Sequence, residues 1–316
     1  MEYYHQPRDH EGSMPVNHDI SSADSSRQAP PVTRRHWLKR VAGSFVAGTA
    51  GVGYYSLHVE PHWIEVVHRP LPIRGLPAEL ENRTLVQISD VHIGHEVDDR
   101  FLIQAFQQVS EWAPDLVVFT GDFLTLHRDG SLPIEKMERV LKHFPQGKLA
   151  TLGILGNHDY GLQWNDLSAA SVVAQIAEDA GIQILRNRSK FVRGLQIVGF
   201  DDYWGPNFGG PRVLADSDFS LPTLILCHNP DVADLPVWYD YRGWILSGHT
   251  HGGQVKPPCF GPPILPIGNK RYAAGEIPLE DGRHLYVNRA LGHSMRVRIN
   301  VRPELTVFRL VREESA

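Results

Sequence analysis

The sequence has few cysteines and no excess of basic residues, and both shortages narrow what the protein can be. Only Cys227 and Cys259 occur in the 316 residues. Two cysteines are too few for a disulfide framework, and their spacing matches no zinc-site pattern. The formal net charge of −5 gives no basic footprint for nucleic acid, so we expect no nucleic-acid partner. An acidic protein that handled phosphate groups would need positive charge from metal ions or a few local cations.

Acidic residues are absent from residues 26–59. Within this stretch, residues 33–39 read Thr-Arg-Arg-His-Trp-Leu-Lys, and a run rich in Ala, Gly and Val follows at 41–57. A basic segment before a weakly apolar run is typical of an export signal. The pair Arg34 and Arg35 resembles a twin-arginine signal, which a receptor reads. The run fits either a cleaved signal or an uncleaved single membrane anchor.

Composition divides the chain into three parts. Residues 1–32 are polar without apolar periodicity, which predicts a disordered polar tail. Residues 33–58 form the twin-arginine-like signal or anchor, or alternatively a buried amphipathic helix, and residues 59–316 form one large globular domain. Because basic residues stay on the cytoplasmic side of a membrane, we expect a membrane-associated or exported protein whose domain faces the periplasm or the outside.

The large domain alternates short apolar runs with helical patterns. Residues 84–89, 115–120 and 149–155 read as buried strands, and helical patterns lie near 98–113, 132–144 and 168–181. This alternation predicts an α/β sheet with helices packed on it. Further strand-like runs occur at 182–186, 195–200, 223–228, 243–247, 284–288 and 305–310.

Five short motifs end or follow these runs, at the edge where open α/β sheets bind ligands. They are Ser89-Asp90-Val91-His92, Gly121-Asp122, Gly156-Asn157-His158-Asp159, Cys227-His228-Asn229 and Gly248-His249-Thr250-His251. In extended chain, residues two apart point to the same side, so each Asp-x-His or His-x-His pair can aim two donors into one pocket. Mixed nitrogen and oxygen donors suit divalent Mn, Fe or Zn. Seven such donors suit two ions that share a carboxylate.

In this order the motifs resemble the calcineurin-like metallophosphoesterases, over about residues 83–310. The stretches 248–255, 285–292 and 302–305 look like the membrane-associated subfamily typified by YkuE and YaeI. The resemblance implies an α/β fold, a four-layer αββα sandwich with a di-metal site at the carboxyl ends of its strands. Ala290 departs from the pattern, because a glycine is usual there.

The resemblance also implies a role for each motif residue. The first ion would be held by Asp90, His92, Asp122 and His251, and the second by Asp122, Asn157, His228 and His249. His158 would be catalytic, either protonating the leaving oxygen or stabilising the phosphoryl group as imidazolium. Asp159 either orients His158 or caps the turn.

Two softer features adjoin the motifs. Residues 201–204, Asp-Asp-Tyr-Trp, either border the pocket or form a solvated turn. Residues 256–270 contain five prolines among apolar residues. That segment either forms an apolar surface for a lipid or bilayer, or packs on its own domain.

The functional prediction is a monomeric, metal-dependent hydrolase that cleaves a phosphoester or pyrophosphate bond with hydroxide activated by two ions. Its substrate is a phosphorylated small molecule or a lipid, including cell-envelope compounds. One alternative is UDP-2,3-diacylglucosamine of lipid A synthesis, although a cytosolic substrate fits an outward-facing domain poorly. A catalytically inactive metal-binding scaffold is a second alternative. The presence of all seven donors and His158 argues against it.

Overall fold

The computed structural model describes residues 33–313. The described residues divide into two units, 33–48 and 49–313, and the polar tail expected at 1–32 lies outside the described residues. Helix α1 (Arg34–Tyr54) begins after Thr33, whose hydroxyl accepts a hydrogen bond from the backbone N–H of His36 (3.4 Å), as an N-cap residue does. Among residues 33–313, no helix combines the length and the apolar character that a membrane crossing needs. The division into tail, signal and catalytic domain stays a prediction.

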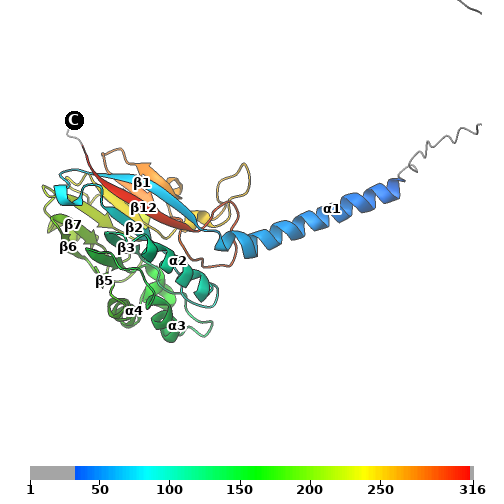
Figure 1. Ribbon diagram of the computed structural model, residues 1–316, viewed down its shortest axis with the longest axis horizontal. Coiled ribbons are helices and arrows are strands. Elements are labelled where there is room, and N and C mark those ends of the chain that lie inside the picture. The colour runs from blue at the N-terminus through cyan, green and yellow to red at the C-terminus, as the bar shows by residue number, and fades with distance from the viewer. Residues whose placement is uncertain (1–32, 314–316) are drawn as a thin grey trace, which may run out of the picture. The chain divides into compact units, whose positions relative to one another are not determined.

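The second unit is built around two six-stranded sheets (Figure 1). The first sheet contains, in spatial order, β1 (Glu65–Ile73), β12 (Glu304–Arg312), β2 (Thr84–Ile88), β3 (Leu116–Thr120), β4 (Ala150–Ile154) and β5 (Gln183–Ile184). The second contains β10 (Gly275–Pro278), β11 (His284–Val287), β9 (Trp244–Ser247), β8 (Thr223–Leu226), β7 (Leu195–Gly199) and β6 (Arg188–Val192).

Most neighbouring strands are parallel, and this brings the motif loops together. In the first sheet β2, β3, β4 and β5 are parallel, while β12 is antiparallel to β2 and parallel to β1. In the second sheet β7, β8, β9 and β11 are parallel, and the edge strands β6 and β10 are antiparallel to their neighbours. The carboxyl ends of parallel strands meet at one edge of each sheet, and the five motifs follow β2, β3, β4, β8 and β9 there.

Alternating side chains of the inner strands fill two separate layers of the core. Leu85 of β2 and Leu116 of β3 belong to a cluster that also contains Leu224 and Leu246 of the second sheet. That cluster packs the two sheets face to face. Val86 and neighbouring residues point the other way, into a cluster with the helices. This period of two explains why the inner strands read as continuous apolar runs.

Helices cover the outer faces of the two sheets. Three of them, α2 (Asp99–Glu111), α3 (Ile134–Leu141) and α4 (Leu167–Asp179), pack on the first sheet through their apolar residues (Figure 1). The short α5 (Gly210–Ala215) and its neighbouring loops cover the second sheet. The layers therefore run helix, sheet, sheet, helix, and the predicted αββα sandwich is confirmed.

Candidate metal centre

The five motif loops converge where the two sheets place their carboxyl strand ends. Gly121 follows β3 with φ +96, and a Cβ there would lie 2.6 Å from Nδ1 of His228 and 2.8 Å from the backbone nitrogen of Gly156. Only glycine fits this conformation and this contact. Gly121 thus brings the loops after β3, β4 and β8 into direct contact.

The backbone at the predicted ligands differs from the extended chain expected from their spacing. Asp90, His92, Asp122, His249 and His251 all have positive φ, between 48 and 70. Residues other than glycine rarely adopt this left-handed conformation, and each instance costs on the order of 1–2 kcal/mol. Such strain persists only where surrounding contacts impose it, typically at functional sites. The loops are therefore held in shape by their packing.

The first group of predicted ligands lies together. Potential ligand atoms of Asp90, His92, Asp122 and His251 all lie within 4.8 Å of one another, and all four side chains are buried. Nε2 of His92 is 3.0 Å from Nε2 of His251, and Nε2 of His251 is 3.3 Å from Oδ1 of Asp90. Nε2 of His92 is 3.6 Å from Oδ2 of Asp122. One divalent ion could be held by this set.

A second group shares Asp122 with the first. Asp122, His228 and His249 also place potential ligand atoms within 4.8 Å of one another. Nε2 of His228 is 3.2 Å from Oδ2 of Asp122, from Nδ1 of His249 and from Oδ1 of Asn157. These groups bring together six of the seven predicted ligands, and Asn157, the seventh, contacts His228. The assignment of each residue as a ligand stays a prediction.

Each of the four histidines has a partner for the ring nitrogen that faces away from the centre. Nδ1 of His228 contacts the carbonyl oxygen of Thr120 at 2.7 Å, and Nε2 of His249 contacts that of Pro266 at 3.0 Å. A carbonyl only accepts, so these nitrogens carry a proton, and the inward nitrogens are the ones that offer a lone pair when the rings are neutral. For His92 and His251 the outward partners are the hydroxyl of Thr125 (2.9 Å) and the amide oxygen of Gln254 (3.0 Å). Metal-bound histidines are oriented in this way.

Burial and charge set the protonation of the group. Burial lowers the pKa of His249 to about 3 and that of His92 well below its usual value, which keeps both imidazoles neutral. Burial opposes ionisation of Asp90 and Asp122, but nearby histidines outweigh it and lower the pKa of both carboxyls. Neutral imidazole and ionised carboxylate are the forms that bind metal.

His228 shows the charge of the centre most clearly. Burial disfavours its cationic form, yet the charge of Asp122 outweighs burial and raises the pKa of His228 well above its usual value. This attraction reflects the negative charge gathered around the ring. Divalent cations would neutralise that charge, so the donor set fits them.

His158 lies beside the two groups without belonging to either. Its backbone N–H donates to Oδ1 of Asp122 at 2.9 Å, and its half-buried ring meets the ring of His92 edge-on at 4.9 Å. The catalytic role of His158 stays a prediction.

Asp159 caps the backbone and does not orient His158. Its Oδ2 accepts hydrogen bonds from the N–H of Gly156 (2.8 Å) and of Asp122 (3.1 Å), and its Oδ1 accepts from Phe123 (2.8 Å). Both carboxylate oxygens are therefore engaged by main-chain donors. Of the two roles open from the sequence, the contacts favour the structural one, and they fix the strained loop that carries Asp122.

Two tryptophans adjoin the centre. Trp204 lies in the segment 201–204 that the sequence analysis named, whereas Trp164 was not predicted. The ring of Trp204 lies 4.5 Å from that of His249 and stacks on Trp164 at 4.9 Å. Trp164 in turn lies 6.3 Å from the ring of His158. Gln163 and Trp164 both have left-handed φ (61 and 58). Residues 201–204 thus border the site, and the loop after β4 contributes the second ring.

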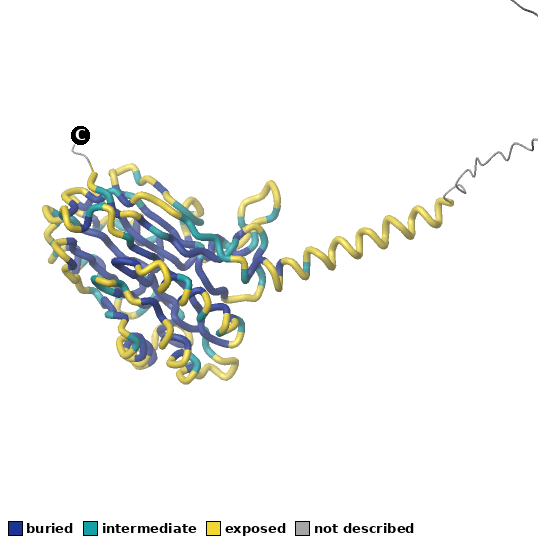
Figure 2. The backbone as a smooth tube through the Cα atoms, in the orientation of Figure 1, coloured by how far each residue is buried: buried dark blue, intermediate teal, exposed yellow. Residues whose placement is uncertain are grey.

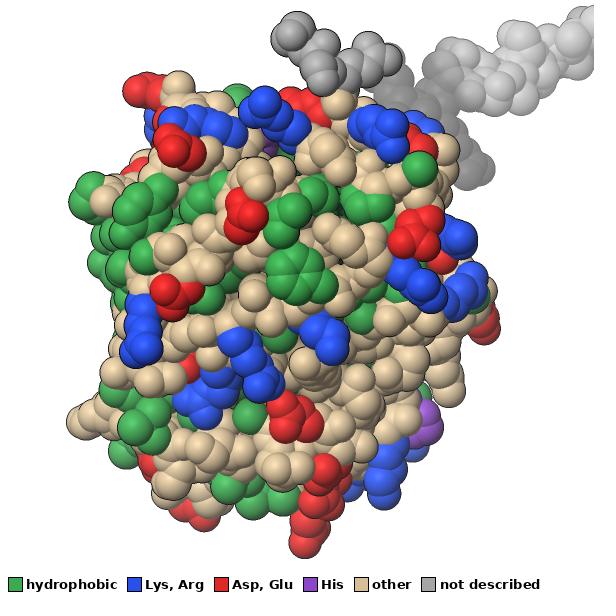
Figure 3. Space-filling model, turned by 90° about the vertical axis from the view of Figure 1, so that its left-hand side faces the viewer, with side chains coloured by type: hydrophobic (Ala, Val, Ile, Leu, Met, Phe, Trp, Pro, Cys, Tyr) green, Lys and Arg blue, Asp and Glu red, His purple; other side chains and the backbone are tan. Residues whose placement is uncertain are grey.

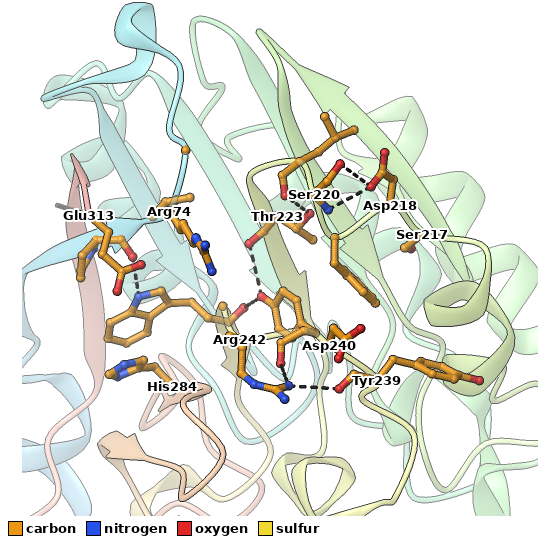
Figure 4. A pocket seen from close by; sticks show the side chains of 18 residues that line it. Arg74, Ser217, Asp218, Ser220, Thr223, Tyr239, Asp240, Arg242, His284 and Glu313 are labelled. Atoms are coloured by element: carbon orange, nitrogen blue, oxygen red, sulfur yellow. Dashed lines mark hydrogen bonds between the residues drawn. The ribbon is translucent and has the colours of Figure 1, made fainter. Parts of the chain in front are cut away.

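A separate hollow of about 760 Å³ lies away from this centre. Thr223 and Trp244, the first residues of β8 and β9, line it, so it sits at the opposite ends of strands that lead to the metal ligands (Figure 4). It contains none of the predicted site residues. We therefore place the chemistry at the cluster of His and Asp side chains, where the donors converge. Figure 3 shows one face of the molecule, on which acidic and basic side chains are interspersed.

The fold and the cluster together define a metal-dependent phosphoester hydrolase. The chain belongs to the calcineurin-like phosphoesterase family, because residues 83–253 match the family model described as "Calcineurin-like phosphoesterase". The predicted family and enzyme class are thereby confirmed.

Three relatives are similar over most of their length. Phosphodiesterase YaeI of Escherichia coli (strain K12) is 32% identical over 290 residues, which cover 89% of this chain and 100% of the relative. Metallophosphoesterase YkuE of Bacillus subtilis (strain 168) is 33% identical over 297 residues, covering 88% and 98%. UDP-2,3-diacylglucosamine pyrophosphatase LpxG of Chlamydia trachomatis serovar D is 29% identical over 313 residues, covering 82% and 93%.

Proposed function

We propose that this protein hydrolyses a phosphoester or pyrophosphate bond at the cluster shared by Asp122, using two divalent ions. The observation that carries the proposal is the orientation of four buried histidines, whose outward nitrogens meet acceptors while the inward ones converge. Mn, Fe or Zn suits these donors. When bound, such a pair of ions polarises phosphoryl oxygens and acidifies water.

The protein's own groups would complete the reaction. Asp122 supplies a carboxylate to both metal-binding groups, and its backbone is fixed by Asp159. His158 would protonate the leaving oxygen, because its ring lies beside both groups and is not required by either. The stacked rings of Trp164 and Trp204 would exclude water from one side and orient an apolar part of the substrate.

For the substrate, we favour a phosphorylated compound with an apolar or ring-bearing portion. The tryptophan pair next to His249 and His158 supports this choice. UDP-2,3-diacylglucosamine is the specific alternative, because the relative LpxG bears that name at 29% identity. A non-lipid phosphodiester of the cell envelope is the other. We also propose that the protein acts as a monomer.

For localisation, we propose that Arg34 and Arg35 form a twin-arginine signal that directs the domain outward across a membrane. Changing both to Lys keeps the charge, so a simple charged anchor would be unaffected, whereas a receptor-read signal should fail. The measurement is the fraction of each form that is exported, determined by fractionating a host that has this pathway. Continued export of the Lys-Lys form, or a parent domain that faces the cytoplasm, would refute the signal. A domain that faces the cytoplasm would also favour the lipid A precursor as substrate.

The function is tested by metal analysis of the purified protein together with hydrolysis assays. We expect about two ions per chain and metal-dependent cleavage of an aryl phosphodiester, an aryl monoester or both. Asp218→Asn, a surface change in the separate hollow, is the control and should alter neither quantity. If protein supplied with Mn, Fe or Zn retains no ion and cleaves neither compound, the proposal is wrong.

A further inference from the structure

Three segments of the second unit lie next to one another beside the metal centre. The loop 256–267 adjoins His249 through the carbonyl of Pro266. The loop 293–301 is joined to Gln254, the partner of His251, by a hydrogen bond from the Gln254 amide to the carbonyl of Met295 (3.4 Å). We call these two loops, together with residues 55–63, the rim.

Residues 55–63 join the rim through two hydrogen bonds. The backbone N–H of Arg298 donates to the carbonyl of Ser56 at 2.9 Å, and that of Val301 donates to Oε1 of Glu60 at 2.6 Å. This is also the segment through which α1 continues into the second unit. The chain that would carry a membrane signal therefore enters the domain at the edge that holds the metal ligands.

The rim exposes large apolar side chains. Phe260 is 72% exposed and Ile264 73%, both at the outer end of the proline-rich loop, and Met295 on the next loop is 59% exposed. Trp63 and Leu57 are 52% and 41% exposed. Exposed apolar groups that cluster in this way mark an interaction surface. Figure 2 shows exposed backbone along the outer parts of these loops.

The proline-rich loop is held in place despite this exposure. Nζ of Lys270 donates to the carbonyls of Leu265 (2.8 Å) and Ile267 (2.6 Å). The backbone of Gly268 and Asn269 is bound by the carboxylate of Asp231. A fixed loop presents Phe260 and Ile264 without a large further cost in conformational entropy.

The charge of the rim is opposite to that of the whole protein. The net charge of the chain is −5, yet residues 254–272 and 293–303 contain no Asp or Glu. The exposed cations are Lys256 and Arg296 in the rim and Lys270 and Arg271 directly after the proline-rich loop. Arg298 is buried and Arg302 pairs with Glu65, so neither is counted. Residues 55–63 add one acidic side chain, Glu60, which is buried. Basic side chains around protruding aromatic and aliphatic groups are complementary to anionic lipid headgroups.

We propose that the rim docks on the surface of an anionic lipid bilayer. Phe260, Ile264 and Met295 would enter the boundary between headgroups and acyl chains, and the surrounding cations would contact lipid phosphates. The metal centre would then face the headgroup layer, within reach of a phosphorylated amphiphile. The docking concerns where the domain sits and does not depend on the reaction proposed above.

The cysteines allow a direct test in the full chain. Cys259 is exposed next to Phe260, whereas Cys227 is buried, so an environment-sensitive dye should label Cys259 alone. With vesicles of phosphatidylcholine and phosphatidylglycerol, we expect a blue shift of the dye and quenching by brominated acyl chains. Vesicles of phosphatidylcholine alone should give a weaker response. As control, the same dye at Ser220→Cys in a Cys259→Ser background, in the separate hollow, should not respond.

Substitutions test the same contact by vesicle flotation. Phe260→Ser with Ile264→Ser should lower partitioning to anionic vesicles by roughly ten-fold or more, since two apolar side chains that would enter the bilayer are lost. Phe191→Ser with Tyr239→Ser removes two side chains of similar exposure (53% and 62%) outside the rim and should have no effect. An unchanged thermal midpoint verifies folding.

Three outcomes would overturn the docking proposal. The first is a dye at Cys259 that stays in water when the protein is bound to anionic vesicles, since α1 alone would then mediate binding. The second is equal loss of partitioning in the rim and control variants. The third is a blue shift that rises with protein concentration without vesicles, which would assign the rim to a second copy of the chain.

Discussion

Replacing His158 by Gln tests the proton-transfer step separately from the metal-binding groups. The side chain of His158 lies beside the rings of His92 (4.9 Å) and Trp164 (6.3 Å), and it interacts with Asp122 through charge alone. Its hydrogen bond to Asp122 comes from the backbone and survives the substitution. We therefore expect metal content and thermal midpoint to stay close to those of the parent.

Turnover should fall by an amount that depends on the leaving group. General acid catalysis typically contributes about 10²–10⁴-fold, so an alkyl phosphoester, whose alkoxide needs a proton, should lose that much. An aryl ester with an acidic phenol leaves without a proton and should lose only a few-fold. The assay compares kcat/KM for the two substrates in the parent, in His158→Gln and in the exposed-surface control His143→Gln.

Two results would refute this reasoning. Equal loss for good and poor leaving groups would remove His158 from the role of general acid and favour stabilisation of the phosphoryl group by its cation. Loss of bound metal in His158→Gln would show that this side chain is needed by the metal groups themselves.

Three further substitutions address other parts of the centre. Asp122→Asn removes a charge from both groups, so metal affinity should fall at least about 100-fold and most activity with it; two retained ions by elemental analysis would contradict the shared carboxylate. The Asn side chain of Asp159→Asn cannot accept all three backbone N–H groups, so the free energy of unfolding, measured in urea with metal present, should fall by about 1–3 kcal/mol. An unchanged urea midpoint would refute the capping role. Trp204→Ala should raise KM about ten-fold for substrates with a ring or acyl chain, since a stacked aromatic contact contributes about 0.5–1.5 kcal/mol beyond its buried area; equal change for a small alkyl phosphate would argue against substrate contact.

The sequence predicted the inner strands and missed three edge strands, for a physical reason. Inner strands such as β3 are buried on both faces and appear as apolar runs. The strand β1 contains Pro70 and Pro72, which cannot donate to a ladder, and it has a neighbour only on one side, β12. The strand β6 reads Arg-Ser-Lys-Phe-Val and is mostly exposed, and β10 buries one residue. Edge strands tolerate such sequences because half of their backbone groups need no strand partner.

The metal groups could be predicted because each motif directly follows an apolar run, and strand ends meet in space. The backbone conformation that brings them together could not be predicted. Left-handed φ at Asp90 or His251 is imposed by contacts between loops, and neither residue signals it as glycine would. The stack of Trp164 on Trp204 joins loops that are distant in sequence, and no local pattern encodes such a pair. Ala290 adopts φ +69 while buried, so the position keeps the conformation that the usual glycine would favour.

The position of β12 has a consequence for the order in which the domain can be made. This strand, Glu304–Arg312, lies between β1 and β2, and forms ladders with both. During synthesis those two early strands therefore wait for a partner that emerges after all the others. The first sheet can close only once Arg312 has left the ribosome, and a truncation near that strand would affect the earliest part of the domain. Transport of a chain still being synthesised would separate β1 and β2 from β12, whereas transport after folding would keep the completed sheet intact.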